Sequence, residues 1–139
     1  MENFLYEMHS GVRWLVVLMT FIAFGYLLFG MLQSRAYDKR THQVMVAWSS
    51  LVGIQWVLGI ILFLVLGAFD VGYQWEHATT MTIALAVAHL YMPFKKRPDA
   101  LRYRAGLAVI AIVMVLVFVG VARLPQGWEE FGITMASSS

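Results

Sequence analysis

Four long apolar runs, separated by short charged segments, most constrain the fold that this chain can adopt. They cover approximately residues 14–32, 44–69, 77–94 and 105–122. A helix of about 18 residues or more can cross the ~30 Å hydrocarbon core of a bilayer. Hydrophobic residues make up 60% of the 139 residues and charged residues only 13%, too few charges to coat a soluble globule. The sequence therefore predicts an integral membrane protein with one all-α domain in contact with lipid.

The connections between the runs are short, so consecutive helices are expected to be antiparallel neighbours. Residues 33–43 link the first two runs, and residues 70–76 form the turn before the third. Pro93 and Pro98 mark the end of the third run, because proline cannot continue a helix unbroken. We expect an up-down-up-down four-helix bundle, without internal repeats or a domain boundary.

The basic residues are concentrated on one side of this predicted bundle. Eight of the ten lysines and arginines lie in two loops, namely Arg35, Lys39, Arg40, Lys95, Lys96, Arg97, Arg102 and Arg104. Only Arg13 and Arg123 fall on the other side. Cytoplasmic loops carry the excess of lysine and arginine, so we expect both loops in the cytoplasm and both termini outside. The expected location is the bacterial inner (cytoplasmic) membrane.

The residues at the two ends of the chain also suggest how they relate to the membrane. The first apolar run is too long for the apolar segment of a signal peptide and has no basic stretch before it, so we expect it to be retained as the first span. The short outer tail contains Trp128, a residue type that favours the headgroup level of a membrane.

Several classes of chemistry are excluded by residue type. The chain has no cysteine, which removes disulfides, iron–sulfur clusters, thiolate metal sites and cysteine catalysis. No nucleophile–base constellation, glycine-rich phosphate loop or nucleic-acid-binding patch is present. The sequence therefore favours an electron carrier or an accessory subunit over a stand-alone enzyme, and no nucleic-acid partner is expected.

Two histidines at the predicted outer edge are the leading candidates for a site. His9 precedes the first run and His77 opens the third. The first and third helices of such a bundle are diagonal, so their inward faces look across the core. Two imidazoles facing one another can be the axial ligands of a b-type haem iron. Alternatively, His9 faces headgroups or water, and His77 makes only local hydrogen bonds at the start of its helix.

Neighbours of this pair are expected to complete a haem site. The guanidinium of Arg13 suits recognition of a propionate, because it donates two parallel hydrogen bonds to a carboxylate. Glu76 would support His77 or hold Arg13. Aromatic residues at the same level would wall the ring, namely Trp14, Tyr73 and Trp75.

His89 lies within the third apolar run, where an ionisable side chain is costly and suggests function. One interpretation is a structural histidine bonded to Gln55 or to Ser49 and Ser50 of the second run. The other is an axial ligand of a second haem, a proton relay or a quinone site. His42 lies at the water boundary, about 10 Å shallower by helix rise, so a haem between His42 and His89 is disfavoured.

A metal site other than haem is a third possibility. Glu7, His9, Glu76 and His77 offer nitrogen and oxygen ligands suited to zinc, copper or iron. Their spacing matches no established metal-binding motif.

The chain resembles a family of small bacterial four-helix membrane proteins in four places. These are the segment from His9 to Trp14, Gln55, the pair Glu76-His77 and the pair Ala88-His89. Members of this family are commonly labelled "cytochrome B" or are uncharacterised. The resemblance implies a b-type haem protein or a subunit of an electron-transport complex. The chain departs from better-understood b-type cytochromes, whose paired histidines lie thirteen or fourteen residues apart on one helix. Here the spacing is twelve residues, which places His77 and His89 roughly 120° apart around the helix axis. This angle disfavours two haems on this helix.

The leading hypothesis is electron transfer through one haem b, with quinol as the electron donor, in a respiratory or photosynthetic complex with other membrane subunits. The first alternative is an accessory subunit of such a complex that binds no cofactor. The second is a membrane protein that handles protons or metal ions through His89 or the outer carboxylate–histidine group.

Overall fold

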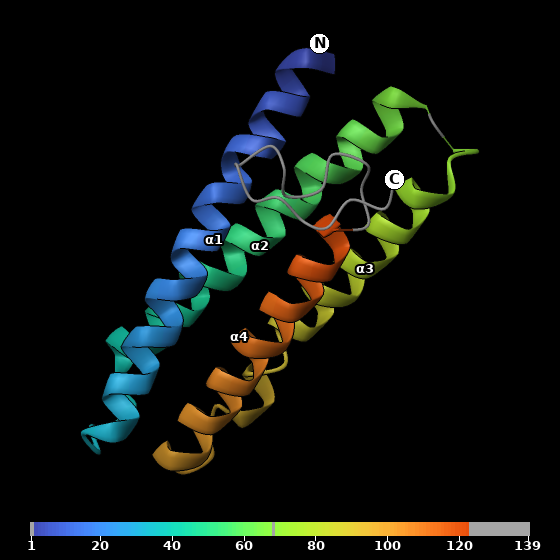
Figure 1. Ribbon diagram of the computed structural model, residues 1–139. Helices are drawn as coiled ribbons and strands as arrows, with labels where there is room; N and C mark the ends of the chain where they lie inside the picture. The colour runs from blue at the N-terminus through green and yellow to red at the C-terminus, as the bar shows by residue number, and fades with distance from the viewer. Residues whose placement is uncertain (1, 68, 123–139) are drawn as a thin grey trace.

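The computed structural model describes residues 2–67 and 69–122, which form helices joined by short links, the all-α class that the sequence predicted (Figure 1). Four α-helices follow in order: α1 Glu2–Leu32, α2 Lys39–Leu66, α3 Gly72–Ala88 and α4 Asp99–Ala122. A short 3-10 helix, η1 Met92–Phe94, lies between α3 and α4. The expectations for Arg123 and Trp128 lie outside the described residues.

The helix α2 begins earlier than its apolar run, because Asp38 caps it. One carboxylate oxygen of Asp38 accepts hydrogen bonds from the Thr41 amide at 2.9 Å and the Thr41 hydroxyl at 2.8 Å. These bonds satisfy an amide that the first helical turn leaves without a partner. The other end closes at Gly67, whose φ of 64° is left-handed and whose amide donates to Phe63. Glycine adopts this conformation without steric cost.

The third helix ends earlier than the predicted residue 94. It stops at Ala88, and η1 follows after a turn. Pro93 explains the difference, since a proline ring clashes with the carbonyl four residues earlier, which here belongs to His89. The next proline, Pro98, precedes α4, and its carbonyl accepts the Arg102 amide at 3.0 Å.

Three helices are long and apolar enough to cross a membrane: Asn3–Leu32, Lys39–Leu66 and Asp99–Ala122. The α3 helix has 17 residues and is shorter than these three. Many large apolar side chains point outward, and Phe29 and Leu32 are more than 60% exposed. Such a surface suits contact with lipid tails.

Each helix packs mainly against two others, so α1 and α3 are diagonal, as are α2 and α4 (Figure 1). The α1–α2 link and the α3–α4 connection lie at one end of the bundle, and the α2–α3 turn lies at the other. Between the helices, Trp48 is fully buried and donates its indole N–H to the Thr20 hydroxyl at 3.0 Å. The Thr20 hydroxyl donates in turn to the Val16 carbonyl.

Close approach of α1 and α4 occurs at glycines. A Cβ at Gly30 would lie 2.6 Å from the Tyr103 hydroxyl oxygen and 2.9 Å from a ring carbon, Cε1. Gly106 of α4 receives the Leu27 side chain in the same way. Gly53 of α2 makes a looser contact, since a Cβ at this position would lie 3.9 Å from the Leu85 side chain of α3.

Replacing Gly30 with alanine should therefore destabilise the protein by about 1–3 kcal/mol, because the rigid Tyr103 ring must move. Its hydroxyl would then lose the hydrogen bond to the Ala36 carbonyl, now 3.2 Å long. Gly25→Ala is the matched control, since nothing lies within 4 Å of its Cβ position on the same helix. Unfolding in detergent should show a lower midpoint for Gly30→Ala and an unchanged or higher one for Gly25→Ala. Equal midpoints would contradict close packing at Gly30.

Candidate functional site

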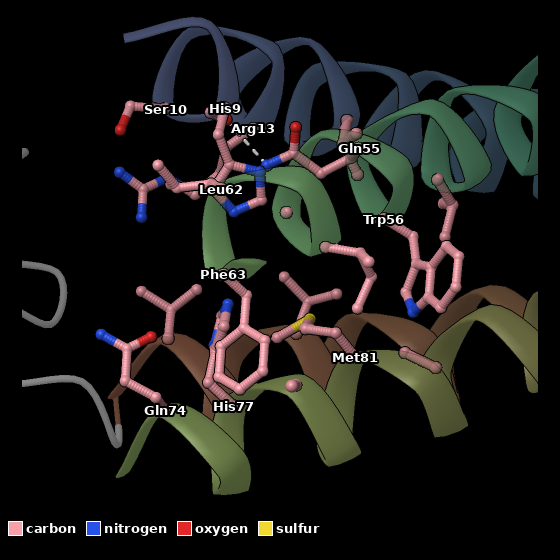
Figure 2. A pocket seen from close by; sticks show the side chains of 18 of the residues that line it. His9, Ser10, Arg13, Gln55, Trp56, Leu62, Phe63, Gln74, His77 and Met81 are labelled. Atoms are coloured by element: carbon pink, nitrogen blue, oxygen red, sulfur yellow. Dashed lines mark hydrogen bonds between the residues drawn. The ribbon is translucent and has the colours of Figure 1, made fainter. Parts of the chain in front are cut away.

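The structure brings His9 of α1 and His77 of α3 together across the diagonal of the bundle (Figure 2). Their ring centroids are 6.4 Å apart, and the two ring planes are nearly perpendicular, at 87°. Both side chains are partly buried. His9 is placed here because α1 begins well before its apolar run and already forms a helix at this level.

The orientation of His77 is set by a backbone carbonyl of α4. Its Nδ1 lies 3.1 Å from the Gly120 carbonyl oxygen. A carbonyl oxygen only accepts hydrogen bonds, so a neutral His77 in this bond carries its proton on Nδ1. Its Nε2 then keeps a lone pair. A hydrogen bond from the other ring nitrogen to a carbonyl is the usual support for a metal-bound histidine.

His9 lies against α2 at Gly59. A Cβ at position 59 would lie 2.9 Å from the Cε1 atom of His9 and 3.5 Å from each ring nitrogen. Among the described residues, the buried Nδ1 of His9 has no hydrogen-bond partner. The backbone carbonyl of His9 accepts a hydrogen bond of 2.7 Å from the side-chain amide of Gln55. This bond ties α1 to α2 at the level of the pair.

A cavity of about 130 Å³ adjoins the two imidazoles, and all four helices line it. Its polar lining includes Ser10, Arg13, Gln55 and Gln74, whereas most of the remaining lining is apolar. The volume is below the 300–1,000 Å³ or so of typical cofactor and ligand sites. In Figure 2, Phe63 and Met81 project into the space between the helices that carry the histidines.

Arg13 lines this cavity and is only 8% exposed, so the structure places it beside the pair. The prediction that aromatic side chains surround the site at this level is wrong. Trp14, Tyr73 and Trp75 are exposed and do not line the cavity, because their helices turn those side chains outward.

Sequence reasoning missed a set of lining residues on one face of α2. These residues follow a helical spacing along the chain: Val52, Gln55, Trp56, Gly59 and Phe63. The indole N–H of Trp56 donates to the Thr82 hydroxyl of α3 at 3.0 Å. Gln55 and Gly59 could have indicated this face from the sequence, because residues four apart lie on the same side of a helix and both interrupt an apolar run.

An aromatic cluster lies between the cavity and the surface. The Phe63 ring, which lines the cavity, meets the Trp75 ring edge to face with centroids 5.1 Å apart. It also meets Phe69 at 5.2 Å. The Trp75 indole N–H donates to the Phe69 carbonyl, and half of the Trp75 side chain is exposed.

The proposed carboxylate–histidine metal group does not assemble. Within residues 2–67 and 69–122, no three side chains of histidine, aspartate or glutamate lie close enough to hold a metal ion. Glu7 and Glu76 are exposed.

His89 is not part of the cavity. It ends α3, twelve residues or about 18 Å of helix from His77, and its Nδ1 lies 3.0 Å from the Leu85 carbonyl of its own helix. The partners expected from the sequence bond elsewhere: Gln55 donates to His9, and the Ser49 hydroxyl shares a hydrogen bond of 3.0 Å with Tyr91. The early end of α3 explains this, since His89 sits at a helix terminus.

No protein-family model, curated protein or solved structure matches this chain.

The bond to Gly120 predicts the tautomer of His77. In the protein labelled with ¹⁵N histidine, the Nδ1 resonance of neutral His77 should be of the protonated type and the Nε2 resonance of the bare type. The spectrum of His77→Ala assigns the signals by their loss. A dominant Nε2–H tautomer would contradict the bond, because its Nδ1 has no proton to donate.

The contact with Gly59 predicts that His9 responds to a single methyl group on α2. Gly59→Ala should displace the His9 ring and shift its ring carbon and nitrogen resonances. Gly53→Ala is the control on the same helix, because its Cβ has room, and it should leave the His9 signals in place. Equal responses in the two variants would mean that His9 does not lie against Gly59.

Proposed function

We propose that this chain is a small b-type cytochrome that binds one haem b between His9 and His77 and transfers electrons in the membrane. The observation that carries the proposal is the separation of the two imidazoles, 6.4 Å between centroids. Two imidazole nitrogens that share one metal ion, at about 2 Å each, place the ring centroids about 6 Å apart. The resemblance to proteins labelled "cytochrome B" points in the same direction.

The donor set of the cavity suits this group. His77 would be one axial ligand, held in orientation by the Gly120 carbonyl, with Nε2 facing the iron. His9 would be the second, using one of the nitrogens that flank its contact with Gly59. Arg13, buried at the cavity wall, would bind a propionate as a charge-assisted pair. When bound, the haem supplies reversible one-electron chemistry at its iron.

The cavity must widen for a porphyrin to enter. Its 130 Å³ is too small for a macrocycle, so the side chains of Phe63 and Met81 have to rotate away. The His9 ring also has to turn from Gly59 toward His77.

Orientation in the membrane follows from charge. We infer an up-down-up-down topology of four spans in the bacterial inner membrane, with the two basic loops in the cytoplasm and both termini outside. A haem held by His9 and His77 would then lie near the outer surface, and the Phe63–Trp75 contact would connect the site with that surface. A suitable role is transfer between quinol and an external acceptor, as a subunit of a respiratory or photosynthetic complex.

The absorption spectrum of the full chain purified in detergent tests the proposal. A Soret band and a sharp α band after reduction with dithionite are expected. His9→Ala and His77→Ala should each lower haem occupancy on the order of ten-fold or more, since each removes one axial ligand. His42→Ala is the matched control, because His42 is on α2 and does not line the cavity; it should keep full occupancy.

Three outcomes would overturn this assignment. Full haem in both His9→Ala and His77→Ala would place the cofactor elsewhere. A colourless but folded protein would favour an accessory subunit that binds no cofactor. Bound zinc or copper, with no colour change on reduction, would favour a protein that handles metal ions.

A further inference from the structure

The end of the bundle opposite the histidine pair carries a second cluster of side chains. The α1–α2 link and the α3–α4 connection meet there (Figure 1). Four segments contribute to it: the link before α2, the first turn of α2, the turn around η1, and the start of α4. Its members are Tyr37, His42, Tyr91, Lys95, Arg102 and Tyr103, and we call them the basic-end cluster.

Buried tyrosines form the floor of the basic-end cluster. Tyr37 and Tyr103 are 7% and 2% exposed, and their rings meet edge to face with centroids 5.0 Å apart. The Arg102 guanidinium lies over the Tyr37 ring, 4.0 Å from its centroid. A cation over an aromatic face is held in place by attraction to the ring. Arg102 is therefore a fixed charge, and its side chain is only half-exposed.

A second wall is formed by His42 and Tyr91, whose ring centroids are 6.3 Å apart. Tyr91 is 5% exposed and shares a hydrogen bond with Ser49 of α2. Among the described residues, the buried Nδ1 of His42 has no hydrogen-bond partner. His42 lies in the first turn of α2, Lys95 directly follows η1 and Arg102 lies in the first turn of α4, so these basic residues belong to segments that meet at the same end of the bundle.

Charge at this end is strongly positive. The two loops and the adjoining helix starts hold eight lysines and arginines against two acids, Asp38 and Asp99. Asp38 is engaged in capping α2, and its hydrogen bonds from Thr41 lower its pKa. Burial raises the pKa of Tyr37 to about 12, so its phenol stays neutral and does not offset the positive charges.

We propose that the phosphate of an anionic phospholipid binds in the basic-end cluster, between His42, Lys95 and Arg102. Basic pockets between membrane helices on the cytoplasmic side suit such headgroups. The arginine offers a planar pair of donors for phosphate oxygens, and the lysine adds a mobile charge. This inference does not depend on the haem.

The surroundings select a lipid over a soluble phosphate. Leu90 and Met92 flank Tyr91 in the chain and are 53% and 47% exposed, and Leu101, beside Arg102, is 39% exposed. These exposed apolar side chains are neighbours of cluster members along the chain and suit contact with acyl chains. A free phosphate ion would use only the charges.

The test is native mass spectrometry of the full chain, released from detergent with phosphatidylglycerol or phosphatidylcholine added. The wild-type protein should bind one phosphatidylglycerol in preference to phosphatidylcholine. Lys95→Gln alone, at an exposed position, should reduce that preference about five-fold, and Lys95→Gln with Arg102→Gln roughly 25-fold. The matched control is Lys96→Gln with Arg104→Gln, which removes two exposed charges from the same region and should change the preference less than about two-fold.

Two results would overturn the inference. An equal loss in the control pair would mean that the lipid responds only to the general positive field. Displacement of phosphatidylglycerol by millimolar inorganic phosphate would identify a site for a soluble anion. Because Lys95→Gln removes no buried contact, a loss of preference in this single variant cannot be attributed to unfolding.

Discussion

The absence of water from the bilayer core is the constraint on which the rest of this structure depends. A peptide group in hydrocarbon needs a hydrogen-bond partner within the protein, and a helix provides one for each peptide group inside the same segment. The three long apolar helices satisfy that demand by themselves. What distinguishes one apolar helix from another is then a small number of polar side chains and glycines at the contacts.

Those polar groups are satisfied in pairs that tie one helix to another. Trp48 of α2 bonds to Thr20 of α1, and Trp56 of α2 bonds to Thr82 of α3. The His77 bond follows the same logic. Its imidazole joins α3 to the Gly120 carbonyl of α4, and this one contact both links the two helices and orients the ring.

The helices and the approximate pairing of His9 with His77 were within reach of sequence reasoning. Apolar runs define spans by length, and short links make neighbours antiparallel, so two histidines at matching depth on the first and third spans face one another. The rotation of each helix about its axis was not accessible. In an almost uniformly apolar run, no polar face shows which side is inward. Trp75 was therefore expected inside and lies outside, whereas Trp56 and Phe63 were overlooked. The early end of α3 was accessible in principle, because Pro93 acts on His89, but the apolar run continues past that point.

The short α3 helix has a consequence for the surrounding lipid. Its 17 residues span about 25 Å, several ångströms less than an average hydrocarbon core of ~30 Å, whereas α1 and α2 exceed that thickness. If all four helices cross, one flank of the bundle favours a thinner bilayer than the other. Such hydrophobic mismatch is relieved by tilt of the longer helices or by local thinning of the bilayer beside the short one. Thinning draws water and headgroups toward the turn after Ala88, so lipid thickness bears on this side of the molecule more than on any other.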